Sequence, residues 1–375
     1  MEVLVSNPFY FGNEVSGDDF CNRVRELDVL KHDIDSGLNV LLYAPRRFGK
    51  TSLLKKLQQN LSGEAQYKVV FFDWFSVASV EEFIQRYFDA IAHSFDATTD
   101  KLFSFFKSVL QLHPNISMSI GALGETSYSL SLDKKEEGRV LEEVLNLPYL
   151  YARHKQVKVV VIWDEFQEVE QFHLEKKIRS VIQAHSRHVS YIFSGSKKSI
   201  LAQMFNDKGR AFYRSVKHLR IDEVHLDDWL GFAMPKFQAT GKQILPEQIE
   251  EIYSITAGFP YYMQQLLFMV WDDAEQVVTE QSMKRSLALM LERENDLYAL
   301  IWSQLTQNQK KAAKHIIRNA GASLYANDAL RISDLSATTL KSTLESLLKK
   351  DVCDRAEGRY YFVDPFMAYW LERLL

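Results

Sequence analysis

Five apolar runs of strand length lie in the first two-thirds of the chain and alternate with segments that carry apolar residues at helical spacing. Each run is apolar nearly throughout, which is typical of strands buried on both faces of a sheet. The runs are residues 39–43, 67–75, 157–166, 188–196 and 215–221, and helical segments at 51–61 and 79–95 follow the first two. The pattern predicts an α/β fold, in which helices cover both faces of a parallel sheet.

One segment interrupts this rhythm. Residues 116–132 alternate small polar and apolar side chains around Gly121 and Gly124. Strict alternation around glycines is typical of a β-hairpin. We therefore expect a hairpin insertion that acts as a structural flap, and its sequence indicates no chemical role.

Beyond residue 221 the strand-length runs stop, and the chain reads as helical up to about residue 294. Because proline and glycine interrupt helices, we expect breaks at Pro235, at Pro246 and at residues 257–260. This stretch is predicted to be a small helical domain.

From about residue 295 the pattern is a helix, a short helix, a third helix, a β-hairpin that turns at residues 356–358, and a final amphipathic helix. That order predicts a winged helix-turn-helix. The expected domains are an α/β core at 1–221, a helical domain at 222–294 and a winged-helix domain at 295–375.

Composition and charge argue against several classes of protein. The net charge of −4 provides no global basic field that would favour nucleic acid. The two cysteines, Cys21 and Cys353, are too far apart for zinc-site spacing and too few for a disulfide framework, which fits a reducing cytoplasm. The N-terminus lacks the features of a secretion signal, and no apolar run is long enough to cross a bilayer. A cytoplasmic protein is expected.

The first strand leads into Ala-Pro-Arg-Arg-Phe-Gly-Lys-Thr at residues 44–51. A phosphate-binding P-loop has Gly-x-x-x-x-Gly-Lys-Ser/Thr between a strand and a helix, so only the first glycine is missing, at Ala44. Lys50 would reach the β- and γ-phosphates, the Thr51 hydroxyl would bind Mg²⁺, and Gly49 would allow the backbone to approach closely. A methyl group at Ala44 weakens the motif without abolishing it, provided that its φ stays negative.

Neighbours of these residues complete the expected phosphate loop. Arg46 and Arg47 are expected to gate the pocket or to pair with acidic residues at 164–165. The predicted phosphate-contacting set is Pro45, Arg46, Arg47, Phe48, Gly49, Lys50, Thr51 and Ser52.

An acidic pair, Asp164 and Glu165, ends the third apolar run. The carboxyl ends of parallel strands share one edge of a sheet, where such folds bind nucleotides, so this pair should lie opposite the P-loop. Asp164 would orient Mg²⁺ through its water shell, and Glu165 would act as the general base that polarises the attacking water. The alternative, a solvated strand end, is less favoured because of the P-loop upstream.

With both motifs in place, the chain resembles the AAA+-related ATPases that are called archaeal-type or STAND-like. The resemblance implies a P-loop core, a helical lid, a winged helix, and bound ATP or ADP with Mg²⁺. It also implies that Asn22 and Arg23 lie beside the adenine, that Ser194 and Ser196 lie near the γ-phosphate, and that Gly258–Pro260 is the lid motif that packs near the base.

Two departures from the family pattern matter. Ala44 replaces a glycine, and the lid motif has aromatic residues where many AAA+ proteins place an arginine that touches the γ-phosphate. The second departure argues against ring-type, force-generating work. The resemblance also implies that Arg210 or Arg214, ahead of the fifth strand, stabilises charge on the γ-phosphate, in cis or across a subunit boundary. A structural role on a loop surface is the alternative for both arginines.

The function of the winged domain stays open between two partners. Its expected recognition helix mixes Lys341, Lys349 and Lys350 with Glu345, so it lacks the basic footprint of a typical DNA reader. DNA contact and protein contact, including autoinhibition, are both compatible with it.

Two hypotheses from different classes follow. The first is a Mg²⁺-dependent ATPase whose hydrolysis switches the lid and the winged domain, as a monomer or a nucleotide-dependent oligomer. The second is a binding module that holds ADP or ATP with little turnover. A small-molecule kinase is disfavoured, since no acceptor pocket is suggested.

Overall fold

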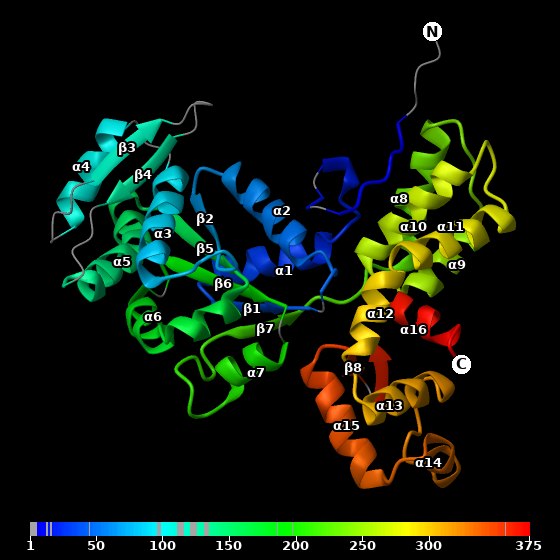
Figure 1. Ribbon diagram of the computed structural model, residues 1–375. Helices are drawn as coiled ribbons and strands as arrows, with labels where there is room; N and C mark the ends of the chain where they lie inside the picture. Colours follow the sequence, from blue (N-terminus) through cyan, green and yellow to red (C-terminus); the bar gives the residue numbers. More distant parts are fainter. Residues whose placement is uncertain are drawn as a thin grey trace. The chain divides into compact units, whose positions relative to one another are not determined.

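The computed structural model describes residues 6–12, 14–15, 17–44, 46–95, 99–110, 116–120, 126–130, 135–185, 187–196, 198–356 and 358–375 (Figure 1). The chain forms two compact units. The sheet unit contains Arg23–Ala44 and Lys50–Ile221, and the helical unit contains Met1–Asn22, Pro45–Gly49 and Asp222–Leu375.

A five-stranded parallel sheet with the order β2-β5-β6-β1-β7 forms the sheet unit. The strands are β1 (Val40–Tyr43), β2 (Tyr67–Asp73), β5 (Lys158–Asp164), β6 (Val189–Gly195) and β7 (Lys217–Arg220). The predicted α/β fold is confirmed. In the register, Asp73 lies beside Asp164 and Tyr43 lies beside Gly195, so the carboxyl ends of these strands meet at one edge.

Helices and aromatic side chains bury this sheet. The helices are α1 (Val24–Asp35), α2 (Lys50–Ser62), α3 (Val80–Ser94), α5 (Glu137–Lys155), α6 (Glu175–Ile182) and α7 (Lys198–Asn206). α3 begins where the Ser79 hydroxyl accepts the Glu82 amide at 3.1 Å, a normal N-cap. Phe83 stacks on Tyr87 one turn along α3, Tyr87 packs against Trp163 of β5, and all three side chains are fully buried. Aromatic side chains of α3 therefore pack against the central strand β5.

The predicted hairpin insertion is confirmed for its two strands, β3 (Ile116–Ile120) and β4 (Thr126–Leu130), which pair antiparallel. Its turn around Gly121 and Gly124 and the final residues 131–132 lie outside the described residues. Side chains of α3 fasten β4, because Asp89 accepts the Tyr128 amide at 2.6 Å and Gln85 accepts the Leu130 amide at 3.1 Å. The preceding helix α4 spans Thr99–Val109.

From Asp222 onward, the helical unit contains first α8 (Leu226–Ala239), α9 (Pro246–Thr256), α10 (Pro260–Asp273) and α11 (Glu280–Arg293). Pro246 and Pro260 start helices, where a missing N–H costs nothing. The expected break at Pro235 is wrong. Pro235 lies inside α8, where the loss of one backbone hydrogen bond does not end the helix.

A glycine fixes the turn between α9 and α10. Gly258 has a φ of +69°, and a Cβ there would lie 2.9 Å from the Tyr253 ring. Both the conformation and the space therefore require glycine at this position.

The predicted winged-helix order is also present. It comprises α12 (Asn295–Ser303), α13 (Gln307–Arg318), α14 (Asn327–Ser333), α15 (Ala337–Lys349), the antiparallel strands β8 (Cys353–Ala356) and β9 (Arg359–Phe362), and α16 (Pro365–Glu372). The Trp370 indole of α16 donates to the Asn295 side chain at 2.9 Å, which ties the last helix to α12. Glu357, in the predicted turn, lies outside the described residues. The boundaries expected between the three domains stay a prediction.

Over the described residues, the structure contains no helix with the length and apolar character that a membrane crossing requires.

Candidate functional site

The loop after β1 leads directly into α2, which begins at Lys50. Lys50 is buried, and its ammonium donates to the Ala44 carbonyl oxygen at 2.9 Å. Ala44 is not among the residues with positive φ, so its methyl group is tolerated in place of the missing glycine. The strand, loop and helix that a P-loop needs are therefore present.

Gly49 shapes the end of this loop. Its φ is +78°, a conformation that side chains rarely adopt, and a Cβ built on it would meet no heavy atom within 4 Å. The position beside the Gly49 Cα is thus open. The N–H groups of a helix's first turn attract anions. Ser52 is buried in that first turn.

Thr51 and Asp164 meet at the carboxyl edge of the sheet. The Thr51 hydroxyl donates to the Asp164 carboxylate at 2.7 Å, although the two residues are 113 positions apart. Asp164 is only 3% exposed, and its other carboxylate oxygen accepts the Glu165 amide at 3.1 Å. A hydroxyl on the phosphate loop and a buried carboxylate on the neighbouring strand are therefore brought together, as the sequence predicted.

Glu165 lies beside Ser196 at the end of β6. The Ser196 hydroxyl donates to the Glu165 carboxylate at 3.0 Å, and the Gln167 amide donates to the same oxygen. Glu165 itself has a φ of +48°, so it turns the chain sharply out of the strand. Gly195 makes room for Gln167, because a Cβ there would lie 1.9 Å from the Gln167 carbonyl oxygen.

Sequence reasoning missed both Gln167 and Asp73. Asp73 ends β2 directly beside Asp164. Burial raises the pKa of Asp73, the charges of Asp164 and Glu165 raise it further, and a hydrogen bond from the Phe75 amide offsets part of this rise. The signal was available, because Asp73 follows an apolar run as Asp164 does. Gln167 carried no comparable signal.

These atoms fit a magnesium ion and a chain of phosphates. A hydroxyl and a carboxylate are hard oxygen ligands of the kind that Mg²⁺ prefers. The Ser194 hydroxyl is fully buried without a hydrogen-bond partner among the described residues, and its predicted place near a γ-phosphate stays a prediction. A buried ammonium at Lys50 completes a donor set suited to phosphate.

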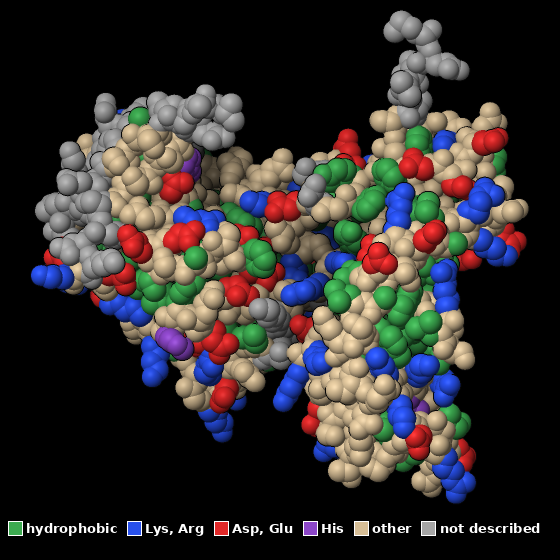
Figure 2. Space-filling model, in the orientation of Figure 1, with side chains coloured by type: hydrophobic (Ala, Val, Ile, Leu, Met, Phe, Trp, Pro, Cys, Tyr) green, Lys and Arg blue, Asp and Glu red, His purple; other side chains and the backbone are tan. Residues whose placement is uncertain are grey.

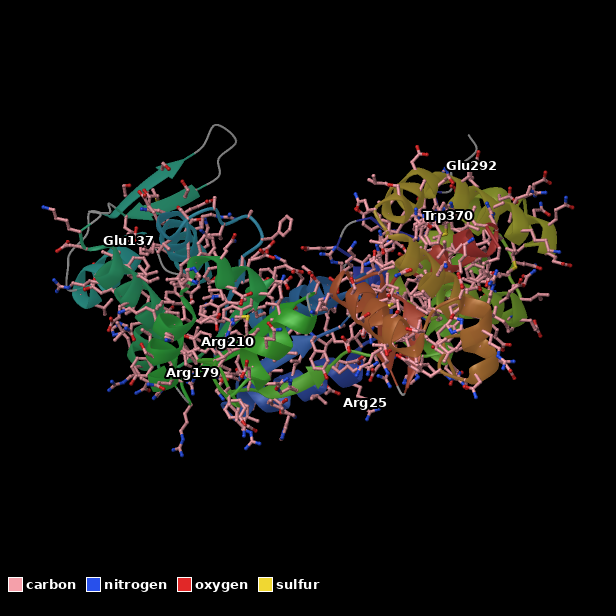
Figure 3. The ribbon with its side chains drawn as sticks, turned by 60° about the horizontal axis from the view of Figure 1, so that its bottom comes forward. Arg25, Glu137, Arg179, Arg210, Glu292 and Trp370 are labelled. Carbon is pink, nitrogen blue, oxygen red and sulfur yellow. The ribbon has the colours of Figure 1, made fainter. Side chains whose placement is uncertain are left out.

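The two candidate arginines have different surroundings. Arg210, labelled in Figure 3, donates to Glu170 at 2.9 Å and to Glu175 at 3.1 Å. These bonds raise the pKa of Arg210 and hold it within the sheet unit. Arg214 is exposed, has a φ of +52°, and places its guanidinium over the Tyr213 ring at 5.3 Å. The structure does not bring Arg210 to Glu165 or Ser196; its carboxylate partners are those of Glu170 and Glu175.

Asn22 and Arg23 both adopt positive φ, at 42° and 100°. The Asn22 amide donates to Asp228, and Arg23 is buried and paired with Glu26 at 2.6 Å. Pro260 is the first residue of α10. Their predicted contact with adenine stays a prediction.

Within the loop, Pro45 lies outside the described residues, Arg46 is exposed, and Phe48 is buried with its ring 4.4 Å from that of Phe259. The Arg47 guanidinium is paired with the Asp364 carboxylate at 2.9 Å. The expected pairing of Arg47 with the acidic residues 164–165 is therefore wrong: the carboxylate that it meets is on the winged domain.

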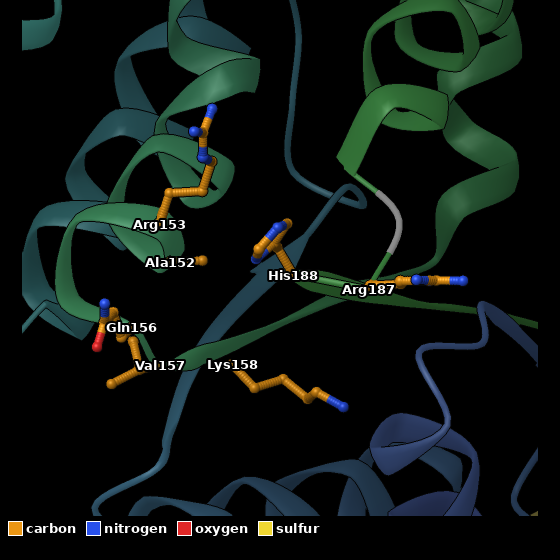
Figure 4. A pocket seen from close by; sticks show the side chains of 7 residues that line it. All are labelled: Ala152, Arg153, Gln156, Val157, Lys158, Arg187 and His188. Atoms are coloured by element: carbon orange, nitrogen blue, oxygen red, sulfur yellow. The ribbon is translucent and has the colours of Figure 1, made fainter.

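A separate hollow of about 430 Å³ lies at the opposite, amino-terminal ends of β5 and β6 (Figure 4). Its lining residues are Ala152, Arg153, Gln156, Val157, Lys158, Arg187 and His188. The basic groups do not converge: in Figure 4, Arg153 points away from Arg187, and the Lys158 ammonium already donates to two backbone carbonyl oxygens at 2.8 and 2.7 Å. None of the predicted site residues lines this hollow.

Comparison with known proteins bears on this site. A family model described as an ATPase domain predominantly from Archaea matches residues 20–266, and a model for a probable winged helix domain matches residues 296–373. No curated protein sequence matches the chain.

Two solved structures have a similar fold. The Walker-type ATPase of Pyrococcus abyssi has a TM-score of 0.67 and 16% identity, over 97% of this chain and 99% of that one. The ORC2 protein of Aeropyrum pernix, in ADPNP–ADP complexes, has a TM-score of 0.55 and 13% identity, over 94% of each chain. Such identities support the shared fold alone. The resemblance to archaeal-type ATPases is confirmed: because the first family model spans more than half of the sequence, this chain belongs to the family of ATPase domains found predominantly in Archaea.

Proposed function

We propose that the protein is a Mg²⁺-dependent ATPase in which ATP binding and hydrolysis change the arrangement of the lid and the winged domain. The observation that carries this proposal is the 2.7 Å hydrogen bond between Thr51 and Asp164, since it joins the phosphate loop to the acidic strand end. The similar ORC2 protein of Aeropyrum pernix is described with ADPNP and ADP, which supports an adenine nucleotide as the ligand.

Each residue has a proposed task. Lys50 would leave its contact with the Ala44 carbonyl oxygen and donate to phosphate oxygens, together with the N–H groups at the start of α2. The Thr51 hydroxyl would hold Mg²⁺ directly, and Asp164 would hold it through water. A bound Mg²⁺ neutralises charge on the phosphates. Asp73 would add negative charge beside Asp164 that favours the cation.

Glu165 is the proposed general base. It would orient a water molecule and accept its proton while the water oxygen bonds to the γ-phosphorus and the bond to ADP breaks. Ser196, at 3.0 Å from the Glu165 carboxylate, would fix its orientation. The orphan hydroxyl of Ser194 is available for a γ-phosphate oxygen.

One observation favours the second candidate, a module that holds nucleotide with little turnover. The same Glu165 oxygen accepts hydrogen bonds from Ser196 and from Gln167, so the carboxylate is already engaged. If these two bonds keep the carboxylate turned away from the attacking water, turnover stays low; if its other oxygen faces that water, as the first candidate requires, the same bonds orient the base. The two candidates therefore differ in turnover and share the binding site.

Phosphate release from ATP by the full chain distinguishes them. We expect turnover with Mg²⁺ that stops when EDTA removes the cation, because the Thr51 and Asp164 oxygens would no longer be bridged to the phosphates. Nucleotide that stays bound through purification, together with negligible phosphate release, would instead support the holding module.

Arg214 is the proposed γ-phosphate arginine, since Arg210 is held by two carboxylates. Arg214→Ala should slow ATP hydrolysis by about tenfold or more and leave the melting temperature unchanged, because a lost guanidinium leaves transition-state charge uncompensated. Arg210→Ala should lower the melting temperature instead. Phosphate release and thermal melting measure the two effects. Slow hydrolysis in Arg210→Ala with normal hydrolysis in Arg214→Ala would reverse the assignment.

We propose that the partner of the winged domain is a protein and not DNA. On α15, the exposed Lys341 and Lys349 flank the exposed Glu345. On the face drawn in Figure 2, acidic and basic side chains are interspersed, and no single-sign field dominates that face. DNA-binding surfaces concentrate positive charge, because phosphate contacts supply most of their affinity.

A further inference from the structure

The arginine of the phosphate loop is paired with the winged domain. The Arg47 guanidinium lies 2.9 Å from the Asp364 carboxylate, although 317 positions separate them. Both belong to the helical unit. Arg47 lies two residues before Gly49 of the phosphate loop. A nucleotide bound to this loop would bring negative charge close to Arg47, and Asp364 already supplies negative charge there.

Two tyrosines of α10 complete the contact. The guanidinium lies over the rings of Tyr261 and Tyr262, at 5.1 and 5.0 Å, and donates to the Tyr262 hydroxyl. The Tyr261 amide donates to the Arg47 carbonyl oxygen at 3.4 Å. Burial lowers the pKa of Arg47, but the Tyr262 hydroxyl and Asp364 outweigh this and raise it. Burial raises the pKa of Tyr262, and Asp364 raises it further, so the phenol stays neutral. Arg47 is thus a permanent cation held by groups of the lid and the winged domain.

Asp364 is fixed independently of Arg47. Its Oδ1 accepts the Phe366 amide at 3.0 Å as the N-cap of α16, and it also accepts the Tyr298 hydroxyl at 3.2 Å. The oxygen that meets Arg47 is the other one, Oδ2. Asp364 therefore connects Arg47 to α12 and α16: its Oδ2 binds Arg47, and its Oδ1 binds the two helices.

The pair is placed so that it can open. The Arg47 side chain is 34% exposed and that of Asp364 is 20% exposed. If the pair separated, water could therefore still solvate both charges. A buried charge that loses its partner without gaining water would be costly. A phosphate can replace the carboxylate, because guanidinium binds both groups in the same fork geometry.

We propose that Asp364 is an acidic latch, which occupies the Arg47 guanidinium in place of a nucleotide phosphate and holds the winged domain to the phosphate loop. Nucleotide binding competes for Arg47 and releases α16 from the loop. The coupling is reciprocal. The Arg47–Asp364 contact lowers the affinity for nucleotide by the same factor by which bound nucleotide lowers the equilibrium constant for that contact. The proposal rests on the proposed nucleotide site and adds its regulation by a named carboxylate.

Asp364→Asn tests the latch. Asparagine keeps an oxygen for the Phe366 amide and the Tyr298 hydroxyl and is an equally good N-cap, so the fold should persist. It lacks the charge for Arg47. The full-length variant should bind ATP and ADP about five- to fiftyfold more tightly than the wild type in calorimetry, within the range of coupling between linked sites. Glu345→Gln removes one charge from the exposed face of α15 and should leave the affinity unchanged.

A double-mutant cycle isolates the pair. In an Arg47→Ala background, Asp364→Asn should no longer change nucleotide affinity, because the partner of the carboxylate is gone. Hydrogen exchange gives a second readout: ATP should speed exchange at the amides of residues 366–368 in the wild type. The same amides should not respond to ATP in Asp364→Asn.

The outcomes separate the latch from the site itself. If the wild type binds ATP through Lys50 and Asp364→Asn binds it equally well, the latch is overturned and the proposed function stands. If neither protein binds nucleotide, both proposals fall. Binding by Asp364→Asn alone would support a latch strong enough to close the site.

Discussion

Lys50→Ala is expected to weaken ATP binding by about a hundredfold or more. Removing one partner of a buried charged contact costs about 3–5 kcal/mol, and about 1.4 kcal/mol corresponds to a tenfold change in affinity. Lys50 is 7% exposed at the start of α2, where its ammonium is the proposed partner of the β- and γ-phosphates. The variant loses that charge while the helix keeps a strong helix former. Fluorescence titration with an ATP analogue, with circular dichroism to check folding, measures the result.

Lys56→Ala is the matched control. Lys56 lies on the same helix, is only half-buried, and is outside the candidate site. Its removal changes the net charge by the same amount and should change ATP affinity less than twofold. Equal affinities of Lys50→Ala and wild type would remove the phosphate loop from the binding site and with it the proposed function.

Glu165→Gln is expected to slow ATP hydrolysis by about 10²- to 10⁴-fold, the usual contribution of a general base, while ATP still binds. Glutamine has nearly the same shape and keeps an oxygen that can accept the Ser196 hydroxyl, so the strand end should stay in place. It cannot accept the proton of the attacking water. Single-turnover phosphate release and equilibrium binding, measured on the same protein, separate the chemical step from affinity.

Glu168→Gln makes the same chemical change three residues along, in the short 3₁₀ helix Phe166–Phe172, and should hydrolyse ATP at the wild-type rate. If Glu165→Gln also hydrolysed ATP at that rate, its assignment as the base would be lost. If the wild type itself showed no turnover although ATP binds, the nucleotide-holding module would be the better description.

Much of the fold followed from patterns along the chain. The strands could be predicted because their apolar runs are nearly continuous, as burial on both sheet faces requires. The meeting of Thr51 with Asp164 could be predicted because parallel strands align their carboxyl ends. Helix α5 and the continuation of α8 through Pro235 were not foreseen, since local propensity does not reveal where tertiary packing overrides a proline.

The partners of individual side chains were harder to predict. Arg47 was expected to gate the pocket or to pair with the acidic strand end. It pairs with Asp364 instead of that strand end, and nothing in the local sequence of either residue indicates the other. Asp364 reads as an ordinary helix cap before Pro365. A pair of this kind depends on how distant elements fold against each other, which charge patterning along one chain does not encode.

The order of strands in the sheet has a consequence for synthesis on the ribosome. β1 is made early, but both of its neighbours, β6 and β7, are made much later, since Val40 pairs with Ile192 on one side and Lys217 on the other. Backbone pairing for β1 is therefore unavailable until most of this unit has left the exit tunnel. The nascent chain would carry the turn between β1 and α2 exposed and unformed for much of translation, and that turn would be among the last parts to mature.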